Sequence, residues 1–140
     1  MFRKFLVTSK SYLHNEKGFT LIEVLIVITI MGILASVAVP RFTSSIELAN
    51  TAKIQADLQT LDAAIVMYEA EKGTEPNSID SLALYVNDIP APPKGKCRLK
   101  NETSAHEITA TSYTITDVTI SGTTQLRAAL DNHIAGEFGK

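Results

Sequence analysis

Residues 19–39 read FTLIEVLIVITIMGILASVAV, an apolar run that carries a single charge, Glu23. At 1.5 Å per residue, a helix of this length spans the hydrocarbon core of a bilayer, which is about 30 Å thick. The run is rich in Val, Ile and Thr, which favour strands in water. A segment in lipid must satisfy its own backbone hydrogen bonds, however, so it forms a helix. The sequence therefore predicts one membrane-spanning helix near the N-terminus.

The charges on the two sides of this run differ in sign. Residues 1–18 contain four basic residues and one acidic residue, whereas the rest of the chain contains nine basic and fourteen acidic residues. Because basic residues mark the cytoplasmic side of a membrane helix, residues 1–18 are predicted to lie in the cytoplasm and the C-terminal part outside. Length and composition fit one small domain. Its single cysteine, Cys97, excludes an internal disulfide and is expected to be a buried apolar residue.

Beyond the apolar run, Pro40 lacks the amide that would bond the carbonyl of Ser36, yet a helical pattern resumes at once. We expect one helix over residues 19–72, roughly 80 Å long, with Gly73 as its C-terminal cap. Gly32 and Pro40 are predicted to weaken or kink this helix, unless they are simply tolerated in a membrane span. Its second half is amphipathic, because apolar residues recur at helical spacings among charged ones: Ile46, Ile54, Leu58, Leu61, Ile65 and Tyr68.

The C-terminal sequence predicts a small antiparallel sheet. Residues 73–96 are rich in turn formers around a short predicted helix at 78–86, with Ser78 as its N-cap. Three predicted strands follow, at 96–100, 107–116 and 118–121, of which the last two are rich in Thr, Ile, Val and Tyr, and the stretch 125–138 is ambiguous. The predicted class is α+β, a long helix packed on this sheet. Its expected parts are a basic leader at 1–18, a membrane and assembly half of the helix at 19–39, an amphipathic half at 40–73, and a loop with the sheet at 74–140.

Residues 17–23, KGFTLIE, resemble the processing site of type IV prepilins and type II secretion pseudopilins. In that family a prepilin peptidase cuts after the glycine and the new N-terminal residue is methylated, which implies cleavage after Gly18 and methylation of Phe19. The basic leader, the early glutamate and the proline at position 40 match the same pattern. Residues 52–76 are similar to the helix end and loop of major pseudopilins. The C-terminal half has neither the cysteine pair nor the acidic calcium loop of many members.

The resemblance implies a pilin-like fold and a structural role. Its expected partners are copies of the chain or related pilins in a filament, the prepilin peptidase, an inner-membrane assembly platform and membrane lipid. It implies no enzymatic activity and no cofactor. The subunit would sit in the membrane before assembly and in an extracellular or periplasmic filament afterwards, serving adhesion, motility, protein secretion or DNA uptake.

Glu23 is the candidate assembly residue. A carboxylate within an apolar helix costs several kcal/mol unless it is paired or lies near the interface. Cleavage after Gly18 would create a cationic amino group on Phe19, with which Glu23 of a neighbouring subunit could pair. The alternative is an unpaired glutamate at the headgroup boundary.

Four cations alternate near the middle of the C-terminal half: Lys94, Lys96, Arg98 and Lys100. In a strand they would share one face, which could bind nucleic-acid phosphates or an acidic neighbour. More often such a face is a solvated edge strand whose charges prevent pairing. The three histidines, at positions 14, 106 and 133, lack metal-ligand spacing, so no metal site is predicted.

Two other classes of protein remain as alternatives. An ordinary secreted protein would be cut after Ser36-Val37-Ala38 by a general signal peptidase, although Glu23 and the continuing helix argue against this. A membrane-anchored enzyme would need a catalytic triad, paired carboxylates, a phosphate loop or a metal cluster, and the sequence shows none of these patterns. The sequence of the mature N-terminus distinguishes a filament subunit, which begins at Phe19, from a secreted protein, which begins at Val39.

Overall fold

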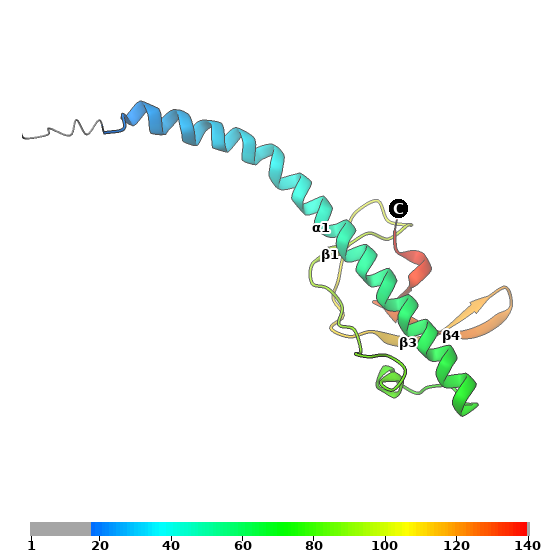
Figure 1. Cartoon of the computed structure of the whole chain (residues 1–140). Coiled ribbons are helices and arrows are strands. Elements are labelled where there is room, and N and C mark those ends of the chain that lie inside the picture. Colours follow the sequence, from blue (N-terminus) through cyan, green and yellow to red (C-terminus); the bar gives the residue numbers. More distant parts are fainter. Residues whose placement is uncertain (1–17, 140) are drawn as a thin grey trace, which may run out of the picture. The chain divides into compact units, whose positions relative to one another are not determined.

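The computed structural model describes residues 18–139, so the predictions for positions 1–17 lie outside the described residues. The chain divides between Val37 and Ala38 into two compact units. The first contains the N-terminal part of helix α1 (Leu21–Lys72), and the second contains the rest of α1 and every strand of the described residues (Figure 1). The predicted α+β class, a long helix packed on small antiparallel sheets, is confirmed.

The C-terminal end of α1 is set by a glycine. The helix is 52 residues long and ends at Lys72. Gly73 then adopts a φ of 67° and donates its amide to the carbonyl of Glu69 at 2.8 Å. A left-handed residue directly after a helix satisfies its last carbonyls, and glycine adopts that conformation without a steric penalty. The predicted end of the helix and its cap are both confirmed.

One face of the C-terminal half of α1 forms the core of the second unit. Ile54, Leu58 and Leu61 are fully buried, and their spacing of three or four residues places them on a single stripe. The prediction that Ile46 belongs to this stripe is wrong, since Ile46 is 58% exposed and burial along α1 begins at Thr51. The stripe packs against buried residues from the loops and sheets, which include Leu82, Leu99, Tyr113, Leu130 and Phe138.

The 3-10 helix η1 (Ile79–Leu82) is shorter than the helix predicted at 78–86. The side chain of Ser78 does not cap it, and its hydroxyl oxygen lies 3.3 Å from that of Ser81 instead. Ile79 and Leu82 are buried, but Leu84 is 89% exposed. The segment therefore lacks a continuous apolar face, and a short helix without one is only marginally stable.

Two small antiparallel sheets follow (Figure 1). β1 (Lys96–Cys97) pairs with β2 (His106–Glu107). The second sheet has the order β3 (Thr114–Ile120), β4 (Thr123–Leu130) and β5 (His133–Ile134).

The bounds predicted for the strands need correction. β1 ends at Cys97 rather than continuing to position 100. The stretches 107–116 and 118–121 are not two strands, because β3 covers the junction between them. β4 begins just before the ambiguous stretch 125–138 and contains three consecutive buried residues, Ala128, Ala129 and Leu130. A strand without alternating burial gives no two-residue pattern in the sequence.

Two tight turns fix the register of the three-stranded sheet. Ser121 and Gly122 connect β3 to β4 with φ of 52° and 83°, and Asp131 and Asn132 connect β4 to β5 with φ of 48° and 69°. Two successive positive φ angles are what a two-residue type I′ hairpin requires, and Asn, Asp and Gly adopt them most easily. Thr123 is thereby placed opposite Ile120, and His133 opposite Leu130.

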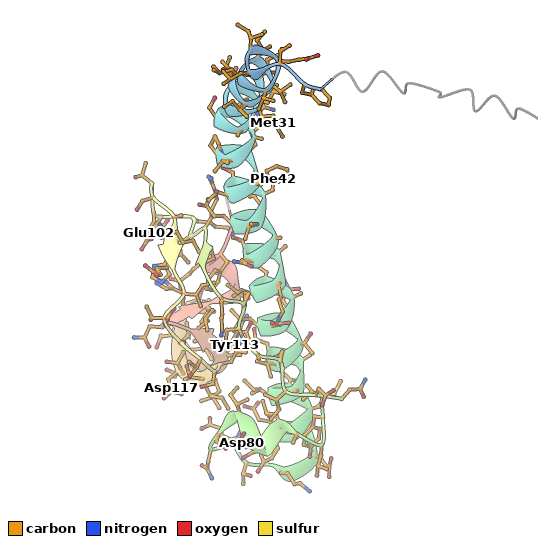
Figure 2. The ribbon with its side chains drawn as sticks, turned by 90° about the vertical axis from the view of Figure 1, so that its left-hand side faces the viewer. Met31, Phe42, Asp80, Glu102, Tyr113 and Asp117 are labelled. Carbon is orange, nitrogen blue, oxygen red and sulfur yellow. The ribbon has the colours of Figure 1, made fainter. Side chains whose placement is uncertain are left out.

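Two aspartates of α1 bind the rest of the second unit through hydrogen bonds. Asp62 accepts from Nε of Arg127 at 2.9 Å, from Nη2 of Arg127 at 2.7 Å and from the amide of Ala128 at 2.8 Å. Asp57 accepts from the hydroxyl of Tyr113 at 2.6 Å, and Figure 2 shows Tyr113 beside the helix. Burial and this hydrogen bond raise the pKa of the Tyr113 hydroxyl, which therefore remains a donor at all physiological pH values.

Cys97 lies in the core, as the sequence predicts. It is fully buried, and Leu99 two residues further on is buried as well and bridges to Phe138. Burial raises the pKa of the Cys97 thiol to about 11, which keeps the sulfur protonated and weakly nucleophilic.

We expect Asp62→Ala to lower the free energy of unfolding of the second unit by about 2–3 kcal/mol, because it removes three hydrogen bonds and one partner of a half-buried ion pair. Asp117→Ala is the matched control, since Asp117 is an exposed aspartate on β3. The measurement is thermal or urea unfolding of the full chain in detergent micelles, followed by the near-ultraviolet dichroism of its tyrosines. Equal stability of the two variants would contradict this account of the contact.

Candidate assembly site

The N-terminus of α1 is capped by a reciprocal pair of side chains. The amide of Glu23 donates to Oγ1 of Thr20 at 3.2 Å, while Oε2 of Glu23 lies 3.4 Å from both the amide nitrogen and Oγ1 of Thr20. This is the capping box Thr-x-x-Glu, which satisfies amides that a helix start leaves unpaired and places a negative charge at the positive end of the helix dipole. This local role of Glu23 was not predicted, although the three-residue spacing of Thr20 and Glu23 is the sequence pattern of a capping box.

The Gly18–Phe19 bond lies in the non-helical segment just before α1. A Cβ added to Gly18 would meet no other atom within 4 Å, and Phe19 is 84% exposed. Gly18 and Phe19 are therefore exposed among the described residues and lie outside the helix.

The first part of α1 presents an apolar surface on all sides. Every Leu, Ile, Val and Met between positions 21 and 37 is more than half exposed. Among the helices of the described residues, α1 is the one long and apolar enough to cross a membrane by length and composition. Glu23 is the single charge at these positions. Other molecules can therefore contact this surface mainly by apolar packing rather than by ion pairs.

Hydroxyl groups within this surface are satisfied by the helix itself. Oγ1 of Thr29 donates to the carbonyl of Leu25 at 2.7 Å, and Oγ of Ser36 donates to the carbonyl of Ile33 at 2.7 Å. A polar group in lipid is costly unless it has a partner, and a bond to the preceding turn supplies one without a second helix.

Gly32 and Pro40 both lie inside α1, which continues through them as helix. A Cβ at Gly32 would meet nothing within 4 Å, so a close contact inside this chain does not explain the glycine. Pro40 has no amide for the carbonyl of Ser36. Beyond the proline, the Ser44 hydroxyl donates to the Pro40 carbonyl at 3.2 Å. The kink predicted for Gly32 and Pro40 remains a prediction.

The four cations predicted to share a strand face are divided by the fold. β1 contains Lys96 but neither Lys94 nor Arg98, and Gly95 has a φ of 105°, which no extended strand residue adopts. Nη2 of Arg98 is 3.1 Å from Oε2 of Glu47 on α1, so this cation is neutralised within the chain. Lys100 lies in a turn after Leu99. These residues do not form one continuous strand, and the segment is tied to α1.

Comparison with known proteins places these features in a family. Residues 13–39 match the family model of the prokaryotic N-terminal methylation motif. No solved structure matches the chain. The chain is 33% identical over 83 residues to type II secretion system core protein G of Klebsiella michiganensis, covering 59% of this chain and 58% of the relative. It is 38% identical over 81 residues to core protein G of Aeromonas hydrophila, covering 58% and 57%.

The chain thus spans somewhat more than half the length of these core protein G relatives. A match to the competence protein ComGC of Halalkalibacterium halodurans is more complete, at 33% identity over 94 residues, 66% of this chain and 92% of the relative. The chain belongs to the type IV pilin and pseudopilin family, whose members are structural subunits of filaments and not enzymes.

Proposed function

We propose that this chain is made as a prepilin, cut between Gly18 and Phe19, methylated at Phe19 and polymerised through the apolar part of α1. The observation that carries the proposal is the exposed apolar surface at positions 21–37, with one charge near its start. Burying a single Leu or Ile side chain lowers the free energy by about 1.5–3 kcal/mol relative to leaving it in water. Exposing the whole surface to water is therefore strongly unfavourable. A bilayer, or a bundle of similar helices, would cover it on every side.

The charges at the two ends of this span support one orientation before assembly. Four cations precede it, which favours a cytoplasmic N-terminus and an external C-terminal domain. In this arrangement the Gly18–Phe19 bond would lie at the cytoplasmic membrane surface, within reach of a prepilin peptidase. An assembly platform in the same membrane would then move the subunit out of the lipid and into a filament of identical or related subunits.

Glu23 would serve both the helix cap and the filament. The cap uses one carboxylate oxygen, Oε2, and Oε1 makes no hydrogen bond among residues 18–139. In the filament, the second oxygen could accept from the cationic amino group of Phe19 on the neighbouring subunit. Such a pair would neutralise two charges that are each costly in an apolar bundle, and it would fix the axial position of one subunit against the next.

The segment 32–40 would let the filament lengthen under load. The carbonyl of Ser36 receives no amide from Pro40, and glycine at position 32 lowers the helix propensity. This stretch is therefore the part of α1 that costs least to unwind, which supports a role for Gly32 and Pro40 as a local hinge.

Replacing Gly18 with Leu should block leader removal, because a bulky side chain then stands on the acyl side of the scissile bond. The uncut precursor should remain in the membrane, and more than nine-tenths of the chain should keep the precursor mass. Gly32→Ala is the matched control, since its added Cβ has open space. Normal maturation of Gly18→Leu, measured by mass spectrometry, would overturn the cleavage assignment.

Four variants separate the cap from the ion pair. Glu23→Gln keeps a capping side chain but removes the charge, whereas Thr20→Val removes the capping hydroxyl and keeps the charge. The pairing model predicts at least a tenfold loss of sheared fibres for Glu23→Gln and Glu23→Ala, partial assembly for Glu23→Asp, and near-normal assembly for Thr20→Val. All should insert and fold.

These variants are compared in cells that lack the wild-type subunit, with equal membrane pools verified before shearing. Normal fibre yield from Glu23→Gln would refute the ion pair. If Thr20→Val loses its fibres while Glu23→Gln keeps a normal fibre yield, Glu23 serves only the helix cap.

We expect Pro40→Ala to stiffen the hinge, because alanine restores the amide that bonds the carbonyl of Ser36. Amide hydrogen exchange across positions 32–40 in detergent micelles should slow about tenfold, and filaments of the variant should extend less under a pulling force. Ala38→Ser provides the control at a neighbouring site that keeps the proline. Unchanged exchange rates in Pro40→Ala would show that Pro40 does not weaken the helix at this point.

A further inference from the structure

Three side chains able to ligate a metal meet in the second unit. Glu102 comes from the loop between β1 and β2, His106 from β2, and His133 from β5. One ligand atom from each lies within 4.8 Å of the other two. The rings of His106 and His133 have centroids 5.4 Å apart and lie at 80° to each other. The fold thus brings together residues from two separate sheets that sequence spacing gave no reason to associate.

Each histidine also lies beside a carboxylate that is outside the set of three, Asp131 for His106 and Glu137 for His133. Nε2 of His106 lies 3.7 Å from Oδ2 of Asp131, while its Nδ1 faces Oε2 of Glu102 at 3.5 Å. Nδ1 of His133 lies 3.3 Å from Oε2 of Glu137. A carboxylate on one ring nitrogen orients the imidazole and raises the basicity of the other, which is how proteins prepare histidines for a metal ion.

The supporting carboxylates are themselves fixed. Asp131 accepts hydrogen bonds from the amide and hydroxyl of Thr109, at 3.0 and 2.8 Å, and from the amide of Ala110 at 3.0 Å. Glu137 accepts from the amide of Ile134 at 3.0 Å. Nε2 of His106 is buried and has no hydrogen-bond partner within residues 18–139. A small shift of the ring toward Asp131 would satisfy that nitrogen and leave Nδ1 for a metal.

We propose that Glu102, His106 and His133 bind one zinc ion, with Asp131 and Glu137 orienting the two imidazoles. Two neutral imidazoles and a carboxylate form a common zinc donor set, and water completes the tetrahedron. Calcium and magnesium are excluded as preferred ions, because they favour sites built from oxygen. Zinc bonds of about 2.0–2.1 Å require the ligand atoms to move closer together. Glu102 can supply that movement, since it lies on a loop at the edge of the domain and its side chain is 40% exposed (Figure 2).

Zinc at this site would join the β1–β2 loop to the segment that follows β4. The bonds of Asp131 to Thr109 and Ala110 connect only the segment after β2 to this part of the fold, whereas the β1–β2 loop reaches the C-terminal segment through the bridge between Leu99 and Phe138. A metal that binds the folded unit and not the unfolded chain stabilises the fold in proportion to the logarithm of its concentration above Kd. The C-terminal part of the domain would therefore become more stable in the presence of zinc.

The test uses the full chain in detergent micelles, purified without a histidine tag and with His14→Gln in every protein, so that the two histidines of the site are the only ones present. Zinc affinity and stoichiometry are measured by competition with a chromophoric chelator. We expect one zinc per chain. Glu102→Gln, His106→Gln and His133→Gln should each weaken binding about 10–100-fold or more.

Glu107→Gln is the matched control, since Glu107 is an exposed glutamate on β2 outside the set of three. It should bind zinc like the parent. Zinc should also raise the unfolding temperature of the parent and of Glu107→Gln by several degrees, with no increase in the three ligand variants and none from calcium. Cobalt should bind at the same position and show the visible absorption of tetrahedral coordination.

Glu102→Gln changes an exposed loop residue, so a failure to fold does not complicate its result, and near-ultraviolet dichroism verifies the folding of the histidine variants. The proposal is overturned if the parent binds no zinc, if the three variants bind it as the parent does, or if Glu107→Gln loses binding equally.

Discussion

The constraint on which everything else depends is an apolar helix surface that its own chain leaves uncovered. Between positions 21 and 37 the large apolar side chains are exposed on every side of α1, while the hydroxyls of Thr29 and Ser36 bond to the helix's own carbonyls. Except near Glu23, this segment therefore needs no polar partner from outside the helix. Lipid or a bundle of like helices would each cover this surface without a polar partner from outside the helix.

The second half of the same helix obeys a different constraint, because it is buried along one stripe only. Apolar packing of Ile54, Leu58 and Leu61 holds the helix against the sheets but is tolerant of small rotations about the helix axis. Asp57 and Asp62 flank that stripe, and their directional hydrogen bonds to Tyr113, Arg127 and Ala128 select one rotation. The face that α1 presents outward from the domain is therefore defined, as regular stacking of subunits requires.

Periodic features were the ones that could be predicted from the sequence. The helix to Lys72, its cap at Gly73 and the buried stripe follow from patterns confined to neighbouring turns, and the cap between Thr20 and Glu23 was equally local although it was overlooked. The strands were harder, because β4 buries three successive residues and so lacks the alternation that marks a strand in a sequence. Contacts between distant segments, such as Arg98 with Glu47 or His106 with His133, left no local pattern at all. They depend on the chain path, which a single sequence does not reveal.

The burial of Cys97 has a consequence for how copies of this chain can be joined. Its thiol lies in the core, and the raised pKa keeps it from forming the thiolate that attacks disulfides. Since it is also the only cysteine of the chain, neighbouring copies cannot become cross-linked through sulfur while they remain folded. A polymer of such subunits is held together only by reversible contacts. Such a polymer would come apart without any reductant, because no covalent bond between subunits would have to be reduced.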